Sequence, residues 1–163
     1  MSDSRSGGGD EERVIFRQYL DAVGLHGLAG AEAAGLQSSE WYALSLITQE
    51  GSLTPGELAT RTGLTTGATT RLIDRLERAG YARRTPDPTD RRRVRVEPVP
   101  DAPARVEEVV GPARRRLAEV LAHYTPDQRA LIFDYFTRAA PAFRAATEEI
   151  RAAAPRRRAR GTD

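Results

Sequence analysis

The feature that most constrains this chain is a pair of short helices joined by a glycine-containing turn, predicted within residues 53–80. Thr54 suits an N-cap, Pro55 suits the first helical position, and Gly63 suits the end of the first helix. Thr65 is a candidate cap for the second helix, which Gly80 should end. Its apolar positions share one helical face: Ala68, Leu72, Ile73, Leu76 and Ala79. This spacing predicts a helix-turn-helix.

The residues after this pair predict a β-hairpin with a basic tip. Residues 81–85 read as a short strand, and residues 86–90 (PDPTD) are rich in turn formers. Arg91, Arg92 and Arg93 follow the turn, and residues 94–96 alternate as a returning strand. A helix-turn-helix followed by such a hairpin predicts a winged helix.

The segments LTPGELATRTGLTTGATTRLIDRLERAGY and DPTDRRRVRV closely resemble the winged-helix core of the multiple-antibiotic-resistance regulator (MarR) family of bacterial transcription factors. The resemblance implies a mainly α fold with a small β-hairpin wing, in which terminal dimerisation helices flank the core. One departure is Thr69, where the family usually has an apolar branched residue facing the core. We expect its methyl group to point inward and its hydroxyl to bond to the preceding turn.

The flanking residues predict helices on both sides of this core. Residues 1–10 are small and polar and are predicted to be disordered. A helix should begin at Glu11 and fray or break in the glycine-rich residues 24–35, and another should end at Gly51. A helix over about 103–123 should kink or break at Gly111-Pro112, and the last helix should begin at the Thr125 cap and bend at Pro141. Residues 155–163 form a basic tail predicted to be disordered.

We therefore expect a single domain over residues 11–154, with the winged core at about 39–97 and dimerisation helices at about 11–33 and 103–153. The predicted terminal helices have broad apolar stripes, such as the one on residues 131–150. Such a stripe is compatible with packing inside one chain or against a second subunit. The resemblance favours a homodimer.

Composition narrows the class of protein. Cysteine is absent, only two histidines are present, and no apolar run approaches the roughly 20 residues of a membrane span. No export signal is found at the N-terminus, so we expect a cytoplasmic protein. No phosphate loop, dinucleotide fingerprint, nucleophile elbow or metal-ligand spacing is found, so we expect no enzyme activity, no cofactor and no metal.

The charge is unevenly distributed along the chain. Residues 61–95 contain ten arginines against four acids, whereas residues 1–60 contain three arginines against nine acids. Every cation is arginine, which suits bidentate contacts to phosphate and guanine, although a genomic codon bias also accounts for the missing lysine. The placement of the positive charge on the predicted winged helix favours binding to DNA.

The candidate DNA contacts lie on the polar face of the second helix and on the hairpin. The helix places short polar residues at its N-terminal end, the end that meets base edges in helix-turn-helix docking. In the resembling family, an arginine two residues after an aspartate enters the minor groove, which corresponds to Arg92 and Asp90. Asp90 is expected to hold an arginine by a charge-assisted bond, and Arg83 and Arg84 are candidates for further phosphate contacts. The assigned residues are Thr54, Thr65, Thr66, Gly67, Thr70, Arg71, Arg75, Asp90, Arg91, Arg92 and Arg93.

The resemblance also implies that a small aromatic or phenolic ligand releases the DNA. Tyr19, Trp41 and Tyr42 are candidates for lining its pocket. The alternative is that they pack in the core, which is the more common role of aromatic residues. We thus expect a homodimeric repressor of a pseudo-palindromic operator. The alternative is a winged-helix protein-interaction module that does not bind DNA, which would have no need of Arg91–Arg93 beside the polar helix face.

Overall fold

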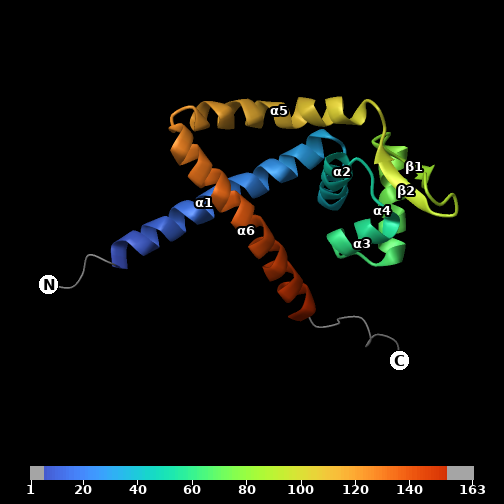
Figure 1. The fold of residues 1–163 in the computed structure, drawn as a ribbon, viewed down its shortest axis with the longest axis horizontal. Coiled ribbons are helices and arrows are strands. Elements are labelled where there is room, and N and C mark those ends of the chain that lie inside the picture. The colour runs from blue at the N-terminus through green and yellow to red at the C-terminus, as the bar shows by residue number, and fades with distance from the viewer. Residues whose placement is uncertain (1–5, 154–163) are drawn as a thin grey trace. The chain divides into compact units, whose positions relative to one another are not determined.

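The computed structural model describes residues 6–153, with side chains from residue 9 onward, as six helices and a two-stranded hairpin (Figure 1). The elements are α1 (Ser6–Ala33), α2 (Ser38–Glu50), α3 (Pro55–Thr62), α4 (Thr66–Arg78), β1 (Ala82–Pro86), β2 (Val94–Pro98), α5 (Ala102–Leu121) and α6 (Pro126–Ala153). This order confirms the predicted mainly α fold with a β-hairpin wing. The chain divides into two compact units, residues 1–111 and residues 112–163.

The core of the first unit is the winged helix-turn-helix. Its fully buried side chains come from α2, α3, α4 and β2, and they include Leu44, Ile47, Leu58, Leu72, Ile73, Leu76 and Val96. In Figure 1, α3 and α4 lie beside the hairpin, whose connecting loop extends away from the helices. Burying the apolar face of α4 leaves its opposite face to solvent, which sets up a candidate binding surface.

The hairpin is held to the helices by a third, very short strand segment. β1 and β2 pair antiparallel, with Arg83 opposite Glu97 and Thr85 opposite Arg95. Leu53, just before α3, forms an antiparallel bridge with Val96 on the other edge of β2, with N–O distances of 2.9 and 2.7 Å. This bridge ties the wing to the start of the helix-turn-helix.

α1 is longer and more regular than the sequence predicted. It begins at Ser6, so residues 6–10 are helical where a disordered tail was expected, whereas residues 1–5 lie outside the described residues. The predicted break in the glycine-rich stretch is also wrong, because the helix runs through Gly30 to Ala33. A Cβ atom at Gly30 would lie 3.2 Å from the indole of Trp41, so glycine permits α1 to approach α2 closely. This packing offsets the roughly 1 kcal/mol by which glycine disfavours a helix.

α5 and α6 both contain an internal proline. The helical structure of α5 runs through Gly111-Pro112 without the predicted break, and α6 continues through Pro141. The predicted start of α6 is confirmed, because the Thr125 N–H bonds to the Gln128 side chain at 2.9 Å and the Gln128 N–H bonds to the Thr125 hydroxyl at 3.3 Å. The basic segment at residues 155–163 lies outside the described residues.

The terminal helices present large apolar side chains to solvent within the single chain. On α1, Val14, Ile15 and Val23 are each more than half exposed. On α6, which has no buried residue, Leu131 is 71% exposed and Ile150 is 70% exposed. Leu117 and Val120 of α5 are also exposed. Within the described residues, no helix is both long and apolar enough to cross a membrane.

Candidate nucleic-acid interface

The turn between α3 and α4 is fixed by the caps that the sequence predicts. The Thr54 hydroxyl accepts the Glu57 N–H at 3.2 Å, and the Glu57 carboxylate accepts the Thr54 N–H at 2.7 Å. The Thr54 hydroxyl also donates to the Glu57 carboxylate at 2.9 Å, and the bonds that this carboxylate accepts from the Thr54 backbone N–H and hydroxyl lower the pKa of Glu57. Gly63 ends α3 with a φ of 70°, in the left-handed region that favours glycine. The Thr54 hydroxyl is therefore already engaged within its own cap, beside a carboxylate.

α4 has a buried apolar side and an exposed polar side. The Thr65 hydroxyl caps the helix by accepting the Ala68 N–H at 3.3 Å. Thr69 is 1% exposed and its hydroxyl donates to the Thr65 carbonyl at 3.0 Å, which confirms the predicted accommodation of threonine in the core. The exposed side begins with Thr66, Gly67, Thr70 and Arg71.

On this exposed side, Thr70 and Arg71 differ in the hydrogen-bonding groups that remain available to a partner. The Thr70 hydroxyl donates to the Thr66 carbonyl at 3.0 Å, so its oxygen is left as an acceptor. Arg71 forms no side-chain hydrogen bond or ion pair with any residue that the structure describes. Its guanidinium therefore keeps all of its donors for an external partner.

Arg75 is one turn further along α4 and is tied to α2. Its Nε donates to an oxygen of Glu40, which lies in the first turn of α2 and is only 4% exposed. The other Glu40 oxygen accepts the Gln37 N–H at 2.9 Å. A residue assigned from the sequence to DNA contact is thus also part of a link between two helices.

The two acids of α4 both pair with one arginine from the wing. Arg84 on β1 bonds to the Asp74 carboxylate at 2.7 Å and pairs with the Glu77 carboxylate through its other terminal nitrogen. Arg83, its neighbour on the strand, pairs instead with Glu97 across the hairpin at 2.7 Å. Both arginines were predicted as possible phosphate contacts; the structure places both in ion pairs. The exposed face of α4 keeps a positive character because its acids face Arg84.

A buried carboxylate organises the loop of the wing. Asp87 is 6% exposed, and one of its oxygens accepts the Thr89 hydroxyl at 2.6 Å, the Thr89 N–H at 2.8 Å and the Asp90 N–H at 3.2 Å. Its other oxygen meets Arg95 at 3.4 Å. The bonds from Thr89, from the Asp90 amide and from Arg95 hold the pKa of Asp87 well below its usual range. Arg95 also bonds to the Ser52 hydroxyl at 2.8 Å, so the same cluster joins the wing to the loop before α3.

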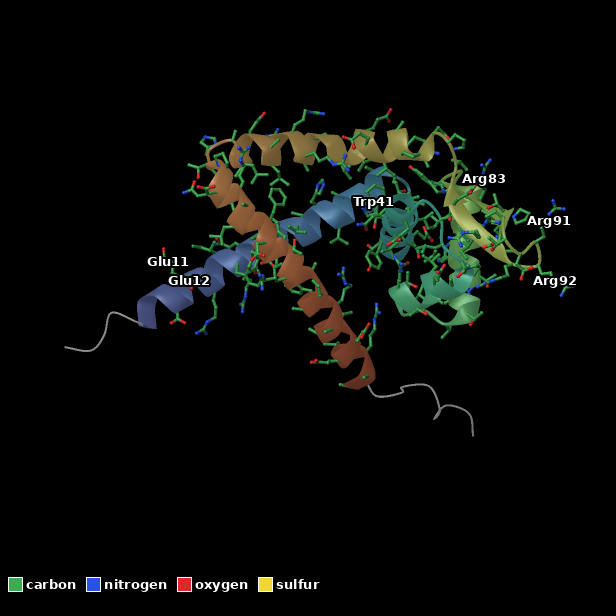
Figure 2. All side chains as sticks on the ribbon, viewed as in Figure 1. Glu11, Glu12, Trp41, Arg83, Arg91 and Arg92 are labelled. Atoms are coloured by element: carbon green, nitrogen blue, oxygen red, sulfur yellow. The ribbon has the colours of Figure 1, made fainter. Side chains whose placement is uncertain are left out.

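The arginine tip of the wing, Arg91 to Arg93, is exposed. Figure 2 shows Arg91 and Arg92 at the loop, extending away from the ribbon, and Arg83 near the base of the hairpin. The expected bond from Asp90 to a guanidinium is not what the structure shows. Its carboxylate accepts the backbone N–H of Arg92 at 3.0 Å, and its carbonyl accepts the Arg93 N–H at 2.8 Å. Asp90 therefore shapes the turn, because a short acidic side chain reaches a nearby backbone amide more easily than a distant guanidinium.

The structure adds two residues that the sequence reasoning did not assign, Glu40 and Asp87, and it gives Arg84 a different role, as the partner of Asp74 and Glu77. Glu40 follows Gln37 at the spacing of a capping box, which signals the helix start but gives no sign of Arg75. Asp87 sits in a turn where an aspartate commonly bonds to amides two residues on, so that signal was available.

The three candidate ligand-binding aromatics lie on α1 and α2. Tyr19 is 46% exposed and Tyr42 is 47% exposed. Trp41 is half-buried, packs against the core and covers Gly30 of α1. Trp41 thus packs between α1 and α2, and its role in ligand binding stays a prediction.

The capped helix-turn-helix, the bridged hairpin and the basic exposed face define a winged-helix regulator. A sequence model of the MarR family matches residues 34–93. The chain is 35% identical to the uncharacterized HTH-type transcriptional regulator YcgE of Bacillus subtilis (strain 168), over 77% of this chain and 82% of that protein. The chain therefore belongs to the MarR family of transcriptional regulators.

Other similarities agree with this assignment. The transcriptional activatory protein BadR of Rhodopseudomonas palustris is 38% identical over 49% of each chain. Among solved structures, a MarR family protein from Bacillus stearothermophilus has a TM-score of 0.65 at 24% identity, with 88% of this chain and 99% of that chain covered. Wild-type MarR from E. coli, in its apo form, has a TM-score of 0.55 at 22% identity, with 77% and 93% covered. These two structural likenesses are to the fold.

Proposed function

We propose that this chain is a homodimeric repressor that binds a pseudo-palindromic operator, with one α4 in each of two successive major grooves. The observation that supports this most is the charge arrangement around α4. Arg71 has no partner among the described residues, the acids Asp74 and Glu77 face Arg84, and three exposed arginines project from the wing. A positively charged surface of this kind suits a polyanion such as DNA, which offers a groove for the reading helix.

Each part of this surface has a distinct role in the proposal. Thr66, Thr70 and Arg71 meet base edges, and Gly67 allows the backbone to come close to the DNA. Thr54 and Thr65, at helix N-termini, lie against phosphates. Arg92 enters a minor groove, where the narrow walls concentrate negative potential, while Arg91 and Arg93 contact the flanking backbone. Arg75 contributes beside Arg71, and Asp90 maintains the wing turn.

The dimer in this proposal is formed by the terminal helices. The exposed apolar side chains on α1 and α6 support it, because monomeric proteins rarely leave such stripes in water. Two-fold symmetry would present two copies of α4, and an operator with two related half-sites matches that symmetry. Occupying two half-sites blocks access of other proteins to the same DNA, which is the simplest route to repression.

The test is a mobility shift with the DNA upstream of the chain's own gene, titrated with salt and with random-sequence competitor. We expect a specific complex whose affinity falls as salt rises, because phosphate contacts release counterions. A reporter under the same promoter then separates repression from activation. Equal and weak binding to all duplexes would instead favour the protein-interaction module.

We propose also that a small aromatic anion releases the complex, by binding near Tyr19, Trp41 and Tyr42. The aromatic side chains of α1 and α2, two of them about half exposed, support this part of the proposal. Salicylate serves as a probe: it should shift the DNA titration to higher protein concentration and quench the fluorescence of Trp41, the only tryptophan of the chain. An unchanged titration at saturating probe would contradict it.

A further inference from the structure

We propose that Glu40 is a positioning residue for DNA recognition, which holds the guanidinium of Arg75 so that this arginine selects sequence rather than adding general attraction for DNA. The inference rests on the proposed function, since it concerns the same DNA-binding surface. It assigns a role to a side chain of α2, which lies outside the helix-turn-helix pair and the wing.

The geometry of Glu40 ties two elements together. Its carboxylate is nearly fully buried, with one oxygen on the Gln37 N–H at 2.9 Å and the other on Nε of Arg75. Glu40 and Arg75 are 35 positions apart in the sequence, so the contact exists only in the folded chain. It connects the first turn of α2 to the last turn of α4.

Glu40 bonds to Arg75 through Nε, so the terminal N–H groups of the guanidinium remain available as donors. Nε of Arg75 is used, whereas its two terminal nitrogens form no hydrogen bond with any residue in the described part of the chain. The Arg75 side chain is 36% exposed. Because a guanidinium is a rigid planar fork, fixing Nε fixes the direction of the terminal N–H groups.

Arg75 also lies on the same side of α4 as Arg71. It follows Arg71 by four positions, so the two side chains are neighbours on one side of the helix. Arg71 has no side-chain partner among the described residues, whereas Arg75 is held from behind by a carboxylate. The pair of arginines thus combines, among the described residues, one unpaired and one oriented guanidinium on the reading helix.

Fold stability alone gives a weak reason for placing a buried carboxylate in this ion pair. Burying the Glu40 charge costs desolvation energy, and replacing a buried ion pair by apolar side chains is often neutral or stabilising. The pair also has no net charge, so it adds little to the salt-dependent attraction that drives non-specific binding. What the pair does supply is a fixed orientation, and orientation is what discrimination between base pairs requires.

This argument makes an asymmetric prediction for Glu40→Gln. Glutamine is similar in size and keeps an oxygen for the Gln37 N–H, but it releases the charge and the orientation of Arg75. Affinity for the preferred duplex should fall about ten-fold, within the range expected for one base contact. Affinity for random duplexes should stay equal or rise, and its log–log salt slope should steepen by roughly one to two units per dimer.

Glu50→Gln is the matched control. Glu50 ends the same helix and pairs at the surface with Arg61 of α3 at 2.6 Å, without a contact to α4. Its substitution removes the same charge from the same element. It should change affinity for both kinds of duplex by the same factor, so that their ratio stays that of the wild type.

A double-mutant cycle tests whether Glu40 acts through Arg75. Arg75→Gln should lower the ratio of preferred to random affinity, and adding Glu40→Gln should lower it no further. The double variant has neither charge of the Glu40–Arg75 pair, so its affinities can still be measured if Glu40→Gln alone is poorly folded. Additive losses of the ratio would overturn the proposal.

The experiment uses the full chain, a duplex enriched by the wild type from a random-sequence pool, and the unselected pool. Fluorescence anisotropy across a salt series gives affinities and slopes, and circular dichroism gives melting temperatures. A reduced ratio with a steeper random-duplex slope supports the role of Glu40. Parallel losses on both duplexes with an unchanged slope show a purely structural residue and overturn it. Failure of the wild type to enrich any sequence would overturn the proposed function as well.

Discussion

At the scale of single residues, Asp87 illustrates how one carboxylate fixes a loop. It accepts bonds from the Thr89 hydroxyl and from two backbone amides while it also meets Arg95. Each donor favours the ionised form, so the pKa of Asp87 is lowered relative to its ordinary value of about 3.9. A lowered native pKa means that the carboxylate stabilises the wing at neutral pH, and that this stability is lost only as pH falls below that ordinary value.

Asp87 should therefore remain ionised in acid where other aspartates have become protonated. Carbon-13 detection of side-chain carboxyl groups during a pH titration measures this directly, with Asp87→Asn identifying the resonance. We expect the Asp87 signal to titrate below the ordinary aspartate value of about 3.9. A midpoint near about 3.9 would show that the hydrogen bonds to Thr89 and Asp90 do not persist in solution.

Arg71 should read sequence because it is exposed and has no competing partner among the described residues. Arg71→Ala is expected to cost about 1–3 kcal/mol on the preferred duplex and less on random duplexes. Anisotropy titrations with both duplexes measure the two losses. Equal losses would identify Arg71 as a phosphate contact instead.

Arg92 should behave in the opposite way. An arginine in a minor groove responds to groove width and phosphate potential, with little base identity. Arg92→Ala should weaken binding to both duplexes by similar factors and reduce the log–log salt slope by roughly one to two units per dimer. Because the side chain is exposed at the wing tip, the melting temperature should not change. A wild-type slope in the folded variant would remove the wing from the DNA contact surface.

The residue-level pattern shows what sequence can and cannot predict. The exposed positions of α4 follow from helical periodicity, and the Thr54 and Thr65 caps follow from local bonding, so both were predictable. The partners of Glu40 and Arg84 were not predictable in this way. Arg75 approaches Glu40 from 35 positions away, and helical or strand periodicity contains no information about such contacts.

At the scale of elements, Arg84 joins β1 to α4. It meets Asp74 and Glu77, which lie on the reading helix, so it both anchors the wing and screens two acids from DNA. Arg83, next to it on the same strand, pairs with Glu97 within the hairpin. Neighbouring residues of a strand point to opposite faces, which explains why equal side chains have different partners.

This difference yields a matched pair of variants. Arg84→Gln should weaken binding to all duplexes more than Arg83→Gln, although each removes one positive charge. The reason is that only the first leaves Asp74 and Glu77 unscreened near the phosphates. Anisotropy titrations at low and high salt measure the effect, and the difference between the variants should shrink at high salt. Equal effects would show that Arg84 acts through net charge alone.

Element boundaries were predicted well where local chemistry sets them and poorly where packing does. Gly63 and Gly80 end segments with positive φ, and both ends were expected from the glycines. The glycines of α1 gave the wrong prediction, because the same residue type also serves close helix packing. Trp41 over Gly30 is a contact between helices, and only the folded structure distinguishes that use from a helix end.

At the scale of the whole molecule, the open question is what covers the terminal helices. Removing residues 125–163 deletes α6 with its exposed apolar side chains, so it should abolish dimerisation and operator binding together. The two losses go together because a single winged helix binds one half-site only weakly, so stable operator binding needs the dimer. Light scattering of the intact chain at micromolar concentration should give the mass of a dimer. A monomeric mass would contradict the proposal before any deletion is made.

A point substitution sharpens this test, because a deletion removes the whole of α6 and not only its apolar stripe. Leu131 is 71% exposed in the single chain, so Leu131→Glu should leave the fold of an isolated subunit intact. In a dimer that buries this stripe, the same change places a charge in an apolar interface and should shift the monomer–dimer equilibrium strongly towards monomer. Thr137→Glu is the control, since helical periodicity places Thr137 on the other side of α6. Light scattering across a dilution series should show dissociation for Leu131→Glu alone; if both variants stay dimeric, the α6 stripe is not the dimer interface.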